Sequence, residues 1–192
     1  VSRANVKEGD KVLVVGAGTI GVLAAIAAKA KGATVYISDV SEGKLEMAKE
    51  FGVDGTLLND SPEHFDKGVA ELTEGNGFDV TIEAVGLPST FQNCIDACCF
   101  GGRMVLIGVG KKNLDFKFTL IQKKELNVFG SRNALKKDFL ELIDLVHEGK
   151  APLEKIITNV YPFEDAAKAF ADFANNPGDM LKVVFDFSDI NK

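Results

Sequence analysis

Short β-branched runs alternate with longer stretches typical of helices over the first two thirds of the chain. Strands are predicted over 11–15, 34–38, 55–58, 78–83, 103–108 and 125–130. Helices are predicted between them, over the alanine-rich stretch that runs to Ala30 and over about 43–51, 62–73, 89–99 and 118–123. Alternation of this kind indicates right-handed crossovers. The pattern therefore predicts an α/β fold, a doubly wound parallel sheet with helices on both faces.

The last third of the chain no longer shows this regular alternation of strands and helices. An amphipathic helix is predicted over 138–147, because apolar side chains recur there at helical spacing: Phe139, Leu142, Ile143 and Val146. A strand, a helix and a last strand are predicted after it, over 156–161, about 164–173 and 181–187. No stretch rich in proline, glycine or serine separates these elements from the rest. Any division into domains must therefore come from topology.

Composition narrows the class of protein. The chain has 192 residues, a formal net charge of -6 and 46% hydrophobic residues, which fits a globular α/β domain. Its apolar stretches are far shorter than the roughly 20 residues of a membrane-spanning helix, and no signal pattern opens the chain. Lysines and arginines are scattered, whereas nucleic-acid binding needs them clustered. We expect a cytoplasmic protein with a small-molecule ligand, and neither a membrane nor a nucleic acid as its partner.

Three cysteines, Cys94, Cys98 and Cys99, fall on what the pattern predicts to be one helix. Their spacing excludes a disulfide framework. Cys94 and Cys98 would share a helix face, so a metal or redox site stays open as an alternative. Zinc sites usually draw further ligands from a second segment, however, and only His64 and His147 are available. We expect buried structural cysteines in a reducing cytosol, and no metal ligands.

A glycine-rich turn gives the first chemical signal. The sequence GAGTIG at 16–21 follows a predicted strand and opens a predicted helix, which is the context of a dinucleotide-binding turn. Gly16 suits the tight turn, Gly18 lets the backbone approach a pyrophosphate, and Gly21 lets the helix lie close to the strand. The N–H groups and the positive dipole end of the helix would face the phosphates.

Asp39 gives the second signal. It ends the second predicted strand, 18 residues after Gly21, where an acidic side chain can accept hydrogen bonds from the hydroxyls of the adenosine ribose. The 2′-phosphate of NADP would meet this carboxylate, so we expect NAD to be preferred. Lys44, in the first turn of the next helix, is either a second ribose contact or an ordinary surface lysine.

No active-site constellation accompanies these signals. Neither a nucleophile elbow nor a paired-histidine metal motif occurs. Glu83 stands out among the carboxylates because it follows the fourth predicted strand, at the edge where open α/β sheets bind ligands. We nevertheless interpret Glu83, Asp96 and Asp115 as solvated or capping groups. The residues thus predict dinucleotide binding without substrate chemistry of their own.

The chain resembles the carboxyl-terminal, coenzyme-binding half of zinc-type medium-chain alcohol dehydrogenases, and among them the polyol, threonine and sugar-acid branch. The resemblance covers essentially the whole chain. It rests on four passages: VKEGDKVLVVGAGTIG at 6–21, ISDVSEGKLEMAKEFGVD at 37–54, FDVTIEAVG with GGRMVLIGVG at 78–86 and 101–110, and ITNVYPFEDAAKAF with LKVVFDF in the tail. It implies a Rossmann fold and NAD(H) as the coenzyme.

The resemblance also implies residue roles at one end of the coenzyme. The pyrophosphate would be held by the glycine-rich turn, with Lys182 nearby; the turn residues are Gly16, Gly18, Thr19, Ile20 and Gly21. The adenosine ribose would be held by Asp39 and Lys44.

At the other end, two loops would surround the nicotinamide: Val85 with Gly86 beside the cleft, and Ile107 with Gly108 and Val109 against the carboxamide. Arg132 matches an arginine that points into the active-site cleft in the polyol and threonine branch. It favours polyhydroxylated or anionic substrates.

In such enzymes the zinc ligands and the proton relay belong to an amino-terminal GroES-like domain, and none of it precedes Val1. The resemblance divides the present chain into a remnant of the crossing segment at 1–9, an NAD-binding domain at 10–134, and a tail at 135–192 that packs toward the catalytic domain in relatives. We expect the chain alone to be catalytically incomplete, with zinc only in the other domain of the parent enzyme.

The parent reaction implied is hydride transfer between NAD and a secondary alcohol, namely a polyol, a sugar or a sugar acid. Two alternatives stay open: a free-standing NAD(H)-sensing or regulatory module, and a nucleotide-binding enzyme such as a methyltransferase, which Lys44 and the tail passages fit poorly. In the family, the segment 114–132 joins two coenzyme domains edge to edge. We therefore expect a homodimer through this sheet edge, and leave a tetramer open for the parent.

Overall fold

The computed structural model describes residues 1–176, 178 and 180–188. Its main part is a parallel sheet of six strands in the order β3-β2-β1-β4-β5-β6. The strands are β1 (Lys11–Val15), β2 (Thr34–Asp39), β3 (Gly55–Leu58), β4 (Phe78–Glu83), β5 (Cys98–Leu106) and β6 (Asn127–Gly130). This is the doubly wound order of the Rossmann fold, which confirms the predicted fold class.

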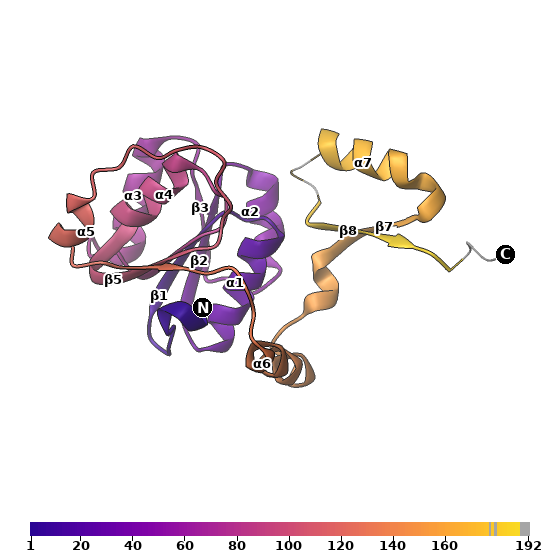
Figure 1. Ribbon diagram of the computed structural model, residues 1–192, viewed down its shortest axis with the longest axis horizontal. Helices are drawn as coiled ribbons and strands as arrows, with labels where there is room; N and C mark the ends of the chain where they lie inside the picture. Colours follow the sequence, from indigo (N-terminus) through magenta and orange to yellow (C-terminus); the bar gives the residue numbers. More distant parts are fainter. Residues whose placement is uncertain (177, 179, 189–192) are drawn as a thin grey trace.

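Helices cover both faces of the sheet (Figure 1). The helices are α1 (Thr19–Ala30), α2 (Glu42–Lys49), α3 (Pro62–Thr73), α4 (Pro88–Ala97), α5 (Thr119–Lys123), α6 (Lys136–His147) and α7 (Ala166–Asn175). Because side chains alternate along a strand, Val12 and Val14 of β1 pack in the buried cluster that includes α1 and α2. Leu13 and Val15 pack in the opposite cluster, with α3 and α4.

Local signals explain where two of these helices begin. The side chain of Ser41 accepts a hydrogen bond from the backbone N–H of Lys44 at the start of α2, at 3.4 Å. Ser61 caps α3 in the same way, with Pro62 as the first helical residue. Both serines act as N-caps that satisfy backbone donors which the helix leaves free.

The predicted helix over 89–99 is too long by two residues. Cys98 has extended backbone angles and pairs with Phe78 of β4, so Cys98 and Cys99 begin β5 instead of ending α4. Pairing with a neighbouring strand has overridden the helical pattern here. The expectation that Cys94, Cys98 and Cys99 share one helix is therefore wrong, and with it the shared helix face of Cys94 and Cys98.

The tail forms a separate parallel pair of strands, β7 (Ile157–Pro162) and β8 (Lys182–Asp186), joined by α7. Figure 1 shows this unit, in orange and yellow, on the side of the sheet that α1 and α2 cover. Leu181, next to β8, is buried in the same cluster as α1. The hydroxyl of Thr19 also donates a hydrogen bond to the carbonyl oxygen of Leu181, at 2.5 Å.

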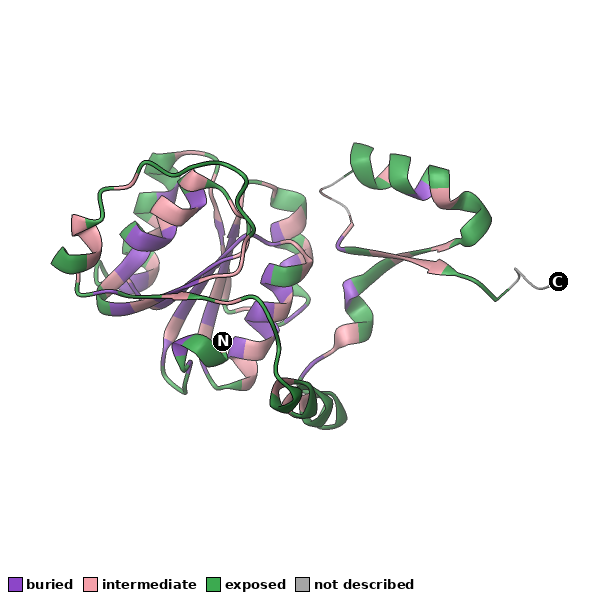
Figure 2. Cartoon of the chain, viewed as in Figure 1, coloured by how far each residue is buried: buried purple, intermediate pink, exposed green. Residues whose placement is uncertain are grey.

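Helix α6 forms over Lys136–His147, as its apolar spacing predicts. The structure describes every residue of this helix, and none of them is fully buried. Figure 2 shows it as exposed on its visible sides, in contrast to α1 and α4. Most of its apolar side chains, among them Phe139 and Ile143, are exposed, while Leu145 packs against the core. Amphipathic spacing predicts the helix and not the surface that covers it.

Among the described residues, none of the helices combines the length and the apolar character that a membrane crossing requires.

Candidate functional site

The predicted site residues gather along the carboxyl edge of the sheet. Strand β1 lies between β2 and β4, and the chain leaves β1 and β4 in opposite directions along the sheet. In open α/β sheets, ligands bind at this reversal of strand order. The loops that follow successive strands at this edge begin at Gly16 after β1, Val40 after β2, Ala84 after β4, Ile107 after β5 and Ser131 after β6.

The glycine-rich turn between β1 and α1 is closely packed on one side and open on the other. Gly16 has a φ of 108°, and a methyl group there would lie 2.7 Å from Cγ2 of Val85. A methyl group at Gly21 would lie 1.7 Å from the carbonyl oxygen of Gly16. A methyl group at Gly18, in contrast, would meet no described atom within 4 Å. The turn thus needs Gly16 and Gly21 for its own packing, while Gly18 faces open space.

The N-terminal end of α1 has no side-chain cap among the described residues. Gly18 is its N-cap, its first turn contains no acidic residue, and no described side chain makes a capping hydrogen bond there. This differs from α2 and α3, where serines cap the helix. An uncapped helix end beside an open turn offers backbone N–H groups to an anion such as a pyrophosphate.

Asp39 lies beside this turn, at the end of β2. Its Oδ2 accepts a hydrogen bond from the backbone N–H of Ala17 at 2.8 Å, and its Oδ1 accepts one from Ser41 at 3.0 Å. The carboxylate thus ties the glycine-rich turn to the start of α2. Each oxygen keeps a lone pair for a further donor, so these contacts are compatible with the predicted ribose contact.

The loops after β4 and β5 cross in direct contact. A methyl group at Gly86, whose φ is 88°, would lie 2.7 Å from the carbonyl carbon of Val109. A methyl group at Gly108 would lie 2.3 Å from the backbone nitrogen of Gly86. The two loops that the sequence analysis assigns to the nicotinamide are therefore brought together, and Val85 joins them to Gly16 of the first turn.

A hollow of about 550 Å³ opens at the far end of this edge, between the loops that follow β5 and β6. Ile107, Gly108 and Val109 line one side, and the exposed Arg132 lines the other. Arg3, from the first turn of the chain, also lines it, and no sequence motif points to that residue. The structure thus places Arg132 beside the 107–109 loop.

Three predicted residues lie at the periphery. Ile20 is half exposed in the first turn of α1. Lys44 is partly buried in the first turn of α2, with its backbone bonded to Ser41. Lys182 is exposed and directly follows Leu181, the residue that accepts the hydrogen bond of Thr19. The tail thus reaches the glycine-rich turn through Thr19, and Lys182 lies next to that contact.

Of the two roles interpreted for Glu83, solvated or capping, the solvated one is wrong. Its side chain is fully buried at the end of β4, where it accepts hydrogen bonds from the following loop. Glu83 could be recognised from the sequence as a residue of interest because it stands at the carboxyl end of a predicted strand. The sequence carries no direct signal for its partner Thr90, in the third position of α4.

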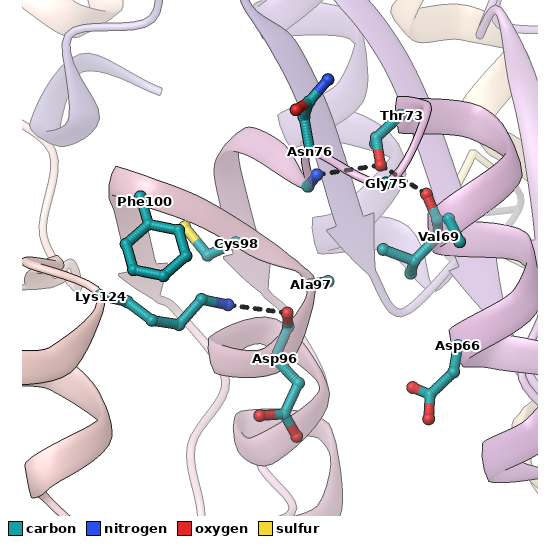
Figure 3. A pocket seen from close by; sticks show the side chains of 12 residues that line it. Asp66, Val69, Thr73, Gly75, Asn76, Asp96, Ala97, Cys98, Phe100 and Lys124 are labelled. Carbon is teal, nitrogen blue, oxygen red and sulfur yellow. Dashed lines mark hydrogen bonds between the residues drawn. The ribbon is translucent and has the colours of Figure 1, made fainter.

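A second cavity, of about 470 Å³, lies at the opposite, amino edge of the sheet (Figure 3). It is lined by the ends of α3 and α4 and by Cys98, Phe100 and Lys124. The ammonium of Lys124 donates to the carbonyl oxygens of Ile95 and Asp96, at 3.0 and 2.9 Å, and so caps the C-terminal end of α4. The cavity shares no residue with the carboxyl edge.

The three cysteines behave as packing residues. Cys94 and Cys98 are buried, and burial raises the pKa of the Cys94 thiol well above its ordinary value and that of Cys98 to about 11. Burial also raises the pKa of Cys99. High thiol pKa values disfavour the thiolate, which is the reactive form and the metal-binding form.

In the described ranges, no three His, Cys, Asp or Glu side chains come together as a group that could hold a metal ion. The donors of this part of the chain thus do not fit a zinc site. No step of the function proposed below is assigned to a metal.

Comparison with known proteins extends these observations. A family profile described as zinc-binding dehydrogenase matches residues 19–148. Sorbitol dehydrogenase 1 of Saccharomyces cerevisiae is 35% identical over 187 residues, which cover 94% of this chain and 52% of the relative. L-galactonate-5-dehydrogenase of Escherichia coli is 35% identical over 187 residues, covering 97% of this chain and 55% of the relative. The chain spans about half the length of these curated relatives.

Solved structures agree. An Escherichia coli oxidoreductase/dehydrogenase of unknown specificity superposes with a TM-score of 0.89 at 26% identity, over 97% of this chain and 53% of that one. An alcohol dehydrogenase of Escherichia coli CFT073, solved in complex with NADH, superposes with a TM-score of 0.85 at 29% identity, over 95% and 53%. With the profile match over more than half of its length, the chain belongs to the zinc-binding dehydrogenase family and corresponds to the coenzyme-binding half of its members.

Proposed function

We propose that this chain is the NAD(H)-binding part of a dehydrogenase that transfers hydride between NAD and a secondary alcohol, namely a polyol, a sugar or a sugar acid. One observation carries the proposal. The glycine-rich turn, Asp39 and the two crossing loops lie along one sheet edge, at the reversal of strand order. A dinucleotide needs a ribose acceptor, an anion site and a walled end in this order, which is the order of β2, β1 and the β4 and β5 loops along the edge.

The residues present fit the coenzyme. The open space at Gly18 and the uncapped end of α1 suit a pyrophosphate, which the backbone N–H groups of the first turn would hold. Asp39 would accept hydrogen bonds from the ribose hydroxyls, and Gly86 with Val109 would form a wall for the nicotinamide. Bound NAD supplies the hydride acceptor. The contribution of the chain is to bind and orient it.

Two observations support the proposed substrate class. The relatives at 35% identity are named for sorbitol and L-galactonate, a polyol and a sugar acid. Arg132 also lies beside the 107–109 loop, exposed and lining the hollow next to the proposed nicotinamide end. A guanidinium at this point suits hydroxyl-rich or anionic substrates, because it carries five hydrogen-bond donors and a fixed charge. The tail from 135 to 192 is proposed to face the catalytic part of the whole protein.

Hydrogen exchange with and without NADH locates the coenzyme. We expect NADH to slow exchange in peptides that cover 15–22, 84–87 and 107–110, because a bound coenzyme orders and shields these backbone amides. Peptides that cover 96–101, at the amino-edge cavity, serve as the internal control and should exchange at an unchanged rate. Protection confined to 96–101, or protection in neither region, would refute this location of the site.

We also propose that the chain forms a homodimer through β6. This strand ends the sheet order and leaves one row of backbone donors and acceptors without a neighbouring strand among the described residues. Val128, in the middle of β6, is 37% exposed. An exposed apolar edge strand pairs readily with a second copy, and a two-fold arrangement closes the assembly.

Replacing Val128 with lysine should shift the chain from dimer to monomer, because a charge on the edge strand opposes strand pairing. Light scattering at micromolar concentration measures the change: the unmodified chain should have about twice the mass of one chain. Val160→Lys is the matched control, since Val160 is an exposed valine of the tail strand β7. A dimer that responds to Val160→Lys and ignores Val128→Lys would assign the contact to the tail and contradict the proposal.

A further inference from the structure

Glu83 is an ionisable residue placed in the protein interior. It is the last residue of β4 and is fully buried. Its Oε1 accepts three hydrogen bonds, from the backbone N–H of Val85 at 3.0 Å, from that of Gly86 at 2.8 Å and from the hydroxyl of Thr90 at 2.6 Å. The side chain therefore fixes the loop after β4 to the first turn of α4.

The backbone of the same residue fixes the second loop. The carbonyl oxygen of Glu83 accepts hydrogen bonds from the N–H groups of Ile107 and Gly108, at 2.9 and 3.0 Å. Five hydrogen bonds thus converge on Glu83, three on its side chain and two on its carbonyl oxygen. They join the two loops that flank the proposed nicotinamide end.

The second carboxyl oxygen lies where these loops touch. Oε2 of Glu83 is buried and has no hydrogen-bond partner among the described residues. A methyl group at Gly108 would lie 2.4 Å from this oxygen. Burying a carboxyl oxygen without a partner is unfavourable, and an apolar side chain would fill this interior at lower cost. Packing alone therefore gives no reason for a glutamate here.

We propose that Glu83 is the positioning residue of the nicotinamide half of the coenzyme site. It sets the spacing of the 84–86 and 107–109 loops without touching the coenzyme itself. The inference rests on the proposed function, because it concerns the same site. It also divides that site: in the adenosine half, Asp39 accepts its hydrogen bond from Ala17 of the glycine-rich turn, and the Glu83 side chain takes no part in that bond.

Comparing two ligands, NADH and ADP-ribose, distinguishes the nicotinamide half of the site from the adenosine half. ADP-ribose carries the adenosine, the pyrophosphate and a ribose, but it lacks the nicotinamide. In Glu83→Met, which keeps the side-chain length and removes both oxygens, we expect NADH to bind about tenfold more weakly, the effect of losing roughly one hydrogen bond to a charged group. ADP-ribose affinity should stay within about threefold, and the fluorescence change of the nicotinamide on binding should decrease. Glu83→Gln, which keeps an acceptor oxygen, should restore most of the NADH affinity.

Thr73→Val is the matched control. Thr73 is a buried residue at the amino edge that donates to the carbonyl oxygen of Val69 at 2.6 Å and accepts from Gly77 at 3.0 Å. Its replacement also removes buried hydrogen bonds, but should weaken neither ligand relative to the other. Equal losses of NADH and ADP-ribose in Glu83→Met, or no loss of either, would overturn the inference. An unmodified chain that binds neither ligand would instead overturn the proposed function.

Thr90→Val carries the test if circular dichroism shows that Glu83→Met is not folded. It keeps the shape of the side chain and removes one donor to Oε1, together with the oxygen that accepts from the backbone N–H of Leu87 at the start of α4. We expect a loss of about threefold for NADH, with ADP-ribose unchanged, since Glu83 loses one neutral donor and both affected contacts lie on the nicotinamide side of the site. Equal effects on the two ligands in this variant would likewise overturn the inference.

Discussion

Gly21→Ala should abolish measurable NADH binding and lower the free energy of unfolding by about 1–3 kcal/mol. The reason is steric. A methyl group at this position would lie 1.7 Å from the carbonyl oxygen of Gly16 and 3.4 Å from Val14, so α1 must move away from β1. The anion site is formed by the turn and by the end of α1 together, and movement of the helix separates them. Urea unfolding and NADH titration measure the two effects.

Gly18→Ala is the matched control for this prediction. A methyl group at Gly18 meets no described atom within 4 Å, and the φ of Gly18, -77°, suits alanine. Stability should therefore be unchanged, while NADH should bind more weakly because the methyl group occupies the space assigned to the pyrophosphate. Unchanged NADH affinity in Gly21→Ala would show that the coenzyme does not use this turn.

Asp39→Asn should reduce the preference for NADH over NADPH by about 10-fold or more, since roughly 1.5 kcal/mol or more is expected for a hydrogen bond to a charged group. The carboxylate accepts from Ala17 and Ser41, and an asparagine keeps one acceptor oxygen for these contacts. A glycine would remove both contacts and loosen the turn, so the amide separates the effect of charge from that of structure. The ratio of the two dissociation constants, by calorimetry, is the measured quantity.

Asp54→Asn is the control for the loss of a carboxylate. Asp54 accepts from the backbone N–H of Val35 at 2.6 Å and pairs with Lys29, and it precedes β3 at the amino edge of the sheet. The ratio for NADPH and NADH should not change in this variant. If Asp39→Asn also leaves the ratio unchanged, Asp39 does not set coenzyme preference.

Much of the fold follows from local signals. The first four strands, with Asp39 added to the second, end where the β-branched runs end, and α3 runs from Pro62 to Thr73 as predicted. The glycine-rich turn is predictable because the local backbone requires glycine at two positions: Gly16 has a positive φ, and Gly21 packs against the backbone of Gly16. The turn is also recognisable because it stands between a predicted strand and a predicted helix.

The remaining features depend on contacts between distant segments. Cys98 leaves the helical pattern because it pairs with Phe78 of another strand. Helix α6 has the spacing of a buried helix, but only Leu145 of its apolar side chains packs against the core among the described residues. Glu83 collects partners from its own loop, from Thr90 and from the 107–109 loop, and no sequence pattern shows their convergence.

The most direct test of the account is titration of the unmodified chain with NADH, NADPH and S-adenosylmethionine under the same conditions. The account predicts saturable binding of one NADH per chain, NADPH binding that is at least about tenfold weaker, and no saturable binding of S-adenosylmethionine. Saturable binding of S-adenosylmethionine without binding of NADH, or equal affinities for NADH and NADPH, would contradict it.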